Sequence, residues 1–84
     1  MNTLDYIVKT TERLVNIPSP SGFTKKVMDF VKEEARAFGY ACSMSRKGGL
    51  IIRVDGRQEE TIGLSAHVDT LGAMVRSINS DGTL

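Results

Sequence analysis

The chain has 84 residues, 40% of them hydrophobic and 25% charged, with a formal net charge of +1, which is the composition of a soluble globular protein of at most one domain. The near-neutral charge argues against a nucleic-acid surface, and no apolar run approaches the ~20 residues that are needed to cross a bilayer. Cys42 is the only cysteine, and the N-terminus lacks the pattern of a secretory signal, so a reducing, cytoplasmic setting is expected.

Two amphipathic helices are predicted in the first half of the chain. Apolar residues recur at spacings of three and four over residues 4–15, with Asn2 or Thr3 available as the N-cap. A second apolar stripe covers residues 23–38, and Gly39 is placed for a left-handed cap at its end.

The loop between these helices, residues 16–22, has the sequence Asn-Ile-Pro-Ser-Pro-Ser-Gly. Each proline disfavours the helical region for the residue before it, so the loop is expected to be stiff and lined by small side chains. Such a loop either passes close to a ligand or simply positions the second helix, and the pattern leaves both interpretations open.

Short strands separated by turns are predicted in the second half. Residues 40–45 alternate as a half-exposed strand does, and a turn with two glycines leads to a strand at 50–54. Two more strands are expected at 61–66 and 73–78. Residues 79–82, Asn-Ser-Asp-Gly, are a turn signal, so the chain is expected to end in mid-hairpin, as a fragment of a longer protein would.

The only histidine, His67, falls where the apolar run 61–66 gives way to polar residues. Side chains two positions apart on an extended backbone point to the same side, so His67 and Asp69 are expected to face one crevice. A metal-bound imidazole usually donates its second ring N–H to a carboxylate, and Asp69 could accept it. The same spacing also suits an ordinary histidine at a strand end, and the dipeptide alone does not decide between the two.

Four segments together carry a family resemblance: residues 17–22, 47–51, 66–75 and 81–82. In this order they resemble the opening of the glutamyl and deblocking aminopeptidases, which are co-catalytic metallopeptidases that include the tetrahedral aminopeptidases and members labelled endoglucanases. The likeness covers essentially the whole chain. At Thr70 the family has Glu, and this departure is in the direction of related carboxypeptidases, tripeptidases and desuccinylases.

The resemblance implies an α/β fold, the N-terminal part of a zinc-aminopeptidase-like domain in which two helices precede several β-strands. Residues 1–72 would belong to the catalytic domain, and 73–84 would be the first strand leading into a β-rich insertion domain. His67 matches the family's first metal ligand, and Asp69 matches the catalytic carboxylate that orients it.

For function, the resemblance implies a metal-dependent aminopeptidase that removes N-terminal residues from peptides and assembles as a homo-oligomer. The full-length protein would hold two divalent metal ions, zinc or cobalt, or alternatively manganese. The family's other ligands lie downstream, so the chain alone is expected to be inactive. The alternatives are a related metallo-carboxypeptidase or deacylase, and a non-enzymatic binding module with the same fold.

Overall fold

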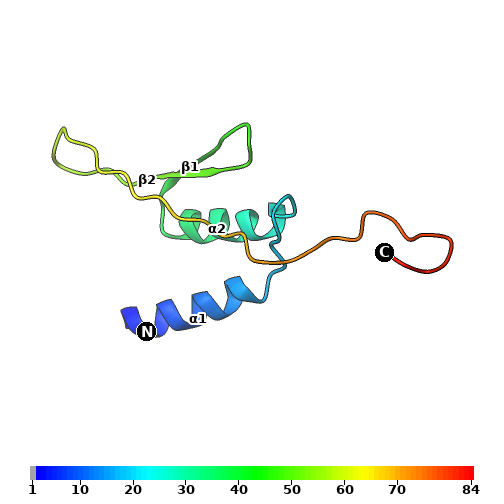
Figure 1. Ribbon diagram of the computed structural model, residues 1–84. Helices are drawn as coiled ribbons and strands as arrows, with labels where there is room; N and C mark the ends of the chain where they lie inside the picture. Colours follow the sequence, from blue (N-terminus) through cyan, green and yellow to red (C-terminus); the bar gives the residue numbers. More distant parts are fainter. Residues whose placement is uncertain (1) are drawn as a thin grey trace.

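The computed structural model describes residues 2–84. Two helices, α1 (Thr3–Val15) and α2 (Lys25–Ala37), precede two short strands, β1 (Ala41–Met44) and β2 (Leu50–Arg53) (Figure 1). The predicted α/β class, with helices first and strands after, is confirmed.

Capping residues set the start of α1 and the end of α2. The side chain of Asn2 caps α1 by accepting a hydrogen bond of 2.8 Å from the main-chain N–H of Asp5. Gly39 follows the C-cap of α2 with φ of +83°, a conformation that favours glycine. The second helix starts later than the apolar stripe predicted, because the N–H of Phe23 bonds to the carbonyl of Pro20 in a turn instead.

β1 and β2 form an antiparallel hairpin in which Ala41 pairs with Arg53 and Met44 pairs with Leu50. Its turn closes with a 2.7 Å hydrogen bond from the N–H of Ser45 to the carbonyl of Gly49. The hairpin therefore forms where the alternation and the glycine turn predicted it.

The buried core is small and centred on α2. In the part of the chain that the structure describes, Val27 and Ala35 are the buried apolar side chains. α1 is held to α2 at the surface, by a 3.0 Å hydrogen bond from the Tyr6 hydroxyl to Glu34 and by the Arg13 guanidinium over the Phe30 ring. The radius of gyration is 16.9 Å, against about 12 Å for a compact chain of this length, so the molecule is elongated.

The two further strands expected at 61–66 and 73–78 do not form. Both segments are extended, but neither pairs with another strand of residues 2–84. Ile62 and Leu64 are 87% and 97% exposed, so the apolar pattern that predicted a buried strand is not satisfied within this chain. An extended segment becomes a strand only when a neighbouring strand pairs with its backbone N–H and C=O groups. Neither β1 nor β2 pairs with residues 61–66 or 73–78.

The C-terminal turn does form. The N–H of Gly82 bonds to the carbonyl of Asn79, and the N–H of Asn79 bonds to the carbonyl of Thr83 at 2.7 Å. Figure 1 shows this turn at the far end of the extended segment, away from the helices. Across residues 2–84, neither helix has the length and apolar character that a membrane crossing requires. The expected division at residue 72 stays a prediction.

Candidate metal-binding site

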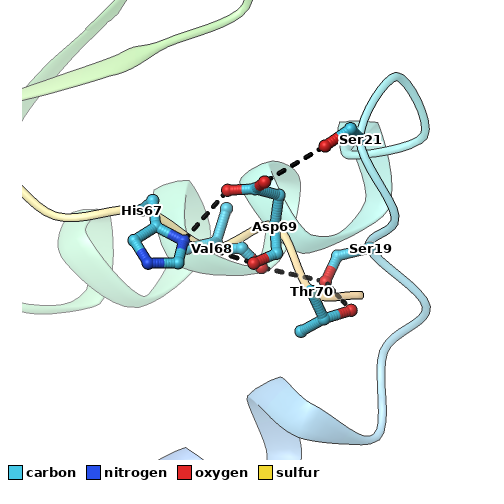
Figure 2. Close-up of polar contacts among 6 residues, drawn as sticks. All are labelled: Ser19, Ser21, His67, Val68, Asp69 and Thr70. Atoms are coloured by element: carbon cyan, nitrogen blue, oxygen red, sulfur yellow. Dashed lines mark hydrogen bonds and ion pairs between the residues drawn. The ribbon is translucent and has the colours of Figure 1, made fainter. Parts of the chain in front are cut away.

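The segment that contains His67 is held in place by the loop between the helices. Pro20 and Thr70 form an isolated parallel bridge, in which the N–H of Thr70 donates to the carbonyl of Ser19 at 2.9 Å. The hydroxyl of Ser19, which is 1% exposed, donates to the carbonyl of Val68 at 2.9 Å (Figure 2). Two hydrogen bonds thus attach the residues on either side of Asp69 to one buried serine.

His67 and Asp69 face one another, as their spacing predicted. Nδ1 of His67 lies 3.0 Å from Oδ1 of Asp69 and 3.2 Å from its carbonyl oxygen (Figure 2). Because both oxygens are acceptors, Nδ1 carries the proton in this pair and the lone pair of a neutral ring lies on Nε2. The side chain of His67 is 83% exposed, so Nε2 is accessible from outside the chain.

The second oxygen of the carboxylate is also bonded. The Ser21 hydroxyl donates to Oδ2 of Asp69 at 3.1 Å. This hydroxyl first, and the His67 imidazole after it, hold the pKa of the Asp69 carboxyl below its ordinary value. Asp69 is therefore a carboxylate at neutral pH and can accept a hydrogen bond from the N–H of the imidazole.

An open depression of about 480 Å³ adjoins the pair. It is lined by Pro20 and Ser21 from the interhelical loop, by His67 and Asp69, and by residues 70–74. The loop comes so close that a Cβ added at Gly72 would lie 2.9 Å from Cβ of Pro20. The predicted crevice is thus formed between the His67 segment and the loop.

Sequence reasoning identified the pair but not the serines that support it. The loop leads into α2 and also contacts the candidate site, and its closeness to a ligand stays a prediction. The departure at Thr70 also has a structural place, because its hydroxyl lies 3.4 Å from Oγ of Ser19 and thus joins the contact to the loop. The two prolines and small residues were the available signal, but no local rule tells which distant segment such a loop will contact.

The donors present suit one part of a metal site. A neutral imidazole whose other nitrogen is bonded to a carboxylate is the usual form of a histidine ligand for zinc and related ions. Within residues 2–84, no three His, Cys, Asp or Glu side chains gather closely enough to hold a metal ion. A catalytic zinc normally has three protein ligands and an open position, so His67 could supply one of them.

The fold and this pair define an α/β chain with a carboxylate-oriented histidine at the edge of a crevice, and comparison with known proteins specifies the class further. Residues 48–84 match the family of M42 glutamyl aminopeptidases. The full chain is 38% identical to "Putative aminopeptidase YhfE" of Bacillus subtilis (strain 168), and 83% of the chain is 35% identical to the glutamyl aminopeptidase of Lactococcus lactis subsp. cremoris (strain MG1363).

Over residues 48–84 the chain is thus similar to the M42 glutamyl aminopeptidases, the family that the resemblance implied. It spans 25% of the length of the Bacillus relative and 20% of the length of the Lactococcus relative. No solved structure matches it significantly.

Proposed function

We propose that this chain is the opening part of a longer metal-dependent aminopeptidase that releases N-terminal residues from peptides. The observation that carries the proposal is the hydrogen bond of 3.0 Å between Nδ1 of His67 and Asp69, which leaves Nε2 directed to an exposed position. The names of the relatives support a peptidase. Because those proteins are several times longer than this chain, the activity is proposed for the whole protein.

In this proposal His67 would hold one of two divalent ions, zinc or cobalt, through Nε2. Bound ions of this kind lower the pKa of a water molecule and polarise the scissile carbonyl. Asp69 keeps the proton on Nδ1, fixes the direction of the ring and makes the imidazole a stronger donor. Ser21 and Ser19 hold Asp69 and its neighbours in place.

The remaining ligands and the general base would come from the rest of the longer protein. One imidazole is short of the three protein ligands that a catalytic zinc takes, so the 84-residue chain by itself should release no amino acids from short peptides with added zinc or cobalt. Leu64 and Leu71 are fully exposed in this chain. In the proposal, the rest of the longer protein and the other subunits of a cytoplasmic homo-oligomer cover such apolar side chains.

The test is made in the longer protein, by metal content and by hydrolysis of short peptides with a free N-terminus. His67→Ala should lose one metal ion and nearly all activity. Asp69→Asn keeps the shape of the side chain but not its charge, and should lower metal affinity or activity by ~10–100-fold. Asp55→Asn is the matched control, because Asp55 is an exposed carboxylate paired only with Arg53 among the described residues and should behave as the parent.

The outcomes separate the proposal from its alternatives. Full metal content and a near-normal rate in His67→Ala would refute the assignment of the ligand. Residues released from the C-terminus would indicate a carboxypeptidase, and release of the acyl group alone from acylated amino acids would indicate a deacylase. Metal-independent peptide binding without turnover would indicate a binding module.

A further inference from the structure

We propose that Ser21 is a positioning residue that acts through Asp69, holding the carboxylate so that its other oxygen is presented to the Nδ1–H of His67. The contact between Ser21 and Asp69 stands on its own geometry. Its consequence for a bound metal rests on the function proposed above.

The need for such a residue follows from the torsion of the carboxylate. The last side-chain torsion of an aspartate is broad, so one hydrogen bond to a flexible, exposed imidazole does not hold the group in one orientation. Here the two oxygens have separate partners: Oδ1 faces His67 at 3.0 Å, and Oδ2 accepts from Ser21 at 3.1 Å (Figure 2). With both oxygens bonded, the carboxylate plane is defined.

Ser21 is suited to this because it lies in a loop that is distant in sequence from Asp69 and is itself bonded to both neighbours of Asp69. It lies 48 positions before Asp69 and directly after Pro20, whose ring fixes its own φ. The loop is joined to the segment at Ser19, which bonds to the carbonyl of Val68 and to the N–H of Thr70. The Ser21 hydroxyl therefore meets Asp69 in a frame that the two neighbours of Asp69 already share.

The predicted consequence is a tautomer preference in His67. A hydrogen-bond acceptor next to one ring nitrogen favours the tautomer in which that nitrogen carries the proton. With Ser21 present, Asp69 accepts from Nδ1 and leaves Nε2 unprotonated. Without it, Asp69 can rotate away from His67, and only the main-chain carbonyl of Asp69, at 3.2 Å, still favours a proton on Nδ1. The share of rings with the proton on Nε2, the atom proposed to bind metal, then rises.

The chain is well suited to a direct measurement, because His67 is its only histidine. With ¹⁵N-labelled histidine, one imidazole is observed, at about pH 8 where an ordinary ring is neutral. The parent chain should show the Nδ1–H form. Ser21→Ala should shift the ring toward the Nε2–H form, and Ser21→Thr, which keeps a hydroxyl, should restore the parent spectrum.

Ser77→Ala is the matched control, since Ser77 is exposed and makes no hydrogen bond to the other described residues. The inference is overturned if Ser21→Ala leaves the tautomer unchanged, if Ser21→Thr fails to restore it, or if the parent chain already shows the Nε2–H form. Far-ultraviolet circular dichroism of each variant should match the parent, because Ser21 is exposed and outside both helices.

A second measurement separates this inference from the proposed function. In the longer protein, zinc affinity is determined by competition with a chromophoric chelator. Ser21→Ala should weaken it by about two- to fivefold, in the lower part of the range for one exposed hydrogen bond, and Ser21→Thr should not. If His67→Ala loses metal but Ser21→Ala changes neither tautomer nor affinity, only the role of Ser21 fails. If Ser21→Ala changes the tautomer while His67→Ala keeps all its metal, the proposed function fails and the positioning role stands.

Discussion

Replacing Ser19 by alanine should loosen the attachment between the interhelical loop and the His67 segment. Ser19 is 1% exposed, and its hydroxyl donates to the carbonyl of Val68 at 2.9 Å. A neutral hydrogen bond contributes about 1 kcal/mol net. The larger cost of an unsatisfied buried acceptor does not apply in full, because Val68 is only half-buried and water can reach it. We therefore expect a local destabilisation of about 1 kcal/mol.

The assay is hydrogen exchange at the amide of Thr70, which donates to the carbonyl of Ser19 at 2.9 Å. If the segment opens and recloses quickly, its exchange rate follows the population of the open state. A loss of about 1 kcal/mol corresponds to roughly fivefold faster exchange, since 1.4 kcal/mol is a factor of ten. The amide of Gly48, in the hairpin turn, should exchange at the parent rate.

Ser77→Ala is the control, because it makes the same change of serine to alanine at an exposed position where no hydrogen bond to the described residues is lost. The reasoning is refuted if Ser19→Ala leaves the exchange of Thr70 unchanged. It is also refuted if the control variant accelerates that exchange equally, since the effect would then not come from the bond to Val68.

Gly72→Ala should accelerate the exchange of the Thr70 amide, because the added Cβ would lie 2.9 Å from Cβ of Pro20; Gly63→Ala, with no atom within 4 Å, should not, and equal effects would contradict the close approach. The C-terminal turn should weaken in acid. The hydroxyl and the N–H of Thr83 hold the pKa of Asp81 below its ordinary value, so their stabilisation is present above about pH 4 and lost as the pH falls through the lowered pKa. Titration of the Asp81 carboxyl by NMR, in the parent chain and in the Thr83→Ala variant, checks this. A midpoint in the parent that is not lower than the midpoint in the variant would contradict the prediction.

The elements predicted from the sequence are those that local chemistry determines. Asn2 caps α1 because its side chain reaches an N–H three residues on, and Gly39 ends α2 because it accepts a positive φ. The hairpin follows from alternation around a glycine turn. The facing of His67 and Asp69 is local in the same way, because the period of an extended backbone is two.

The strands at 61–66 and 73–78 were wrong for this chain because a strand depends on its neighbour. Alternation and apolar content indicate that a segment can pair, but they do not supply the second row of hydrogen-bonding groups. Among residues 2–84, the His67 segment finds a single bridge, between Pro20 and Thr70, and the apolar side chains of Ile62 and Leu64 stay exposed.

By itself, the sequence determined the helices, the hairpin, the pairing of His67 with Asp69 and the resemblance to a family. Only the tertiary structure decided that the loop between the helices would bond Ser21 to Asp69, 48 positions away, and Ser19 to Val68, 49 positions away. The physical reason is the range of the interactions. Caps, turns and the two-residue period of an extended backbone act within a few residues. The partner of a serine hydroxyl that is distant in sequence depends instead on how the helices and the extended segment pack together.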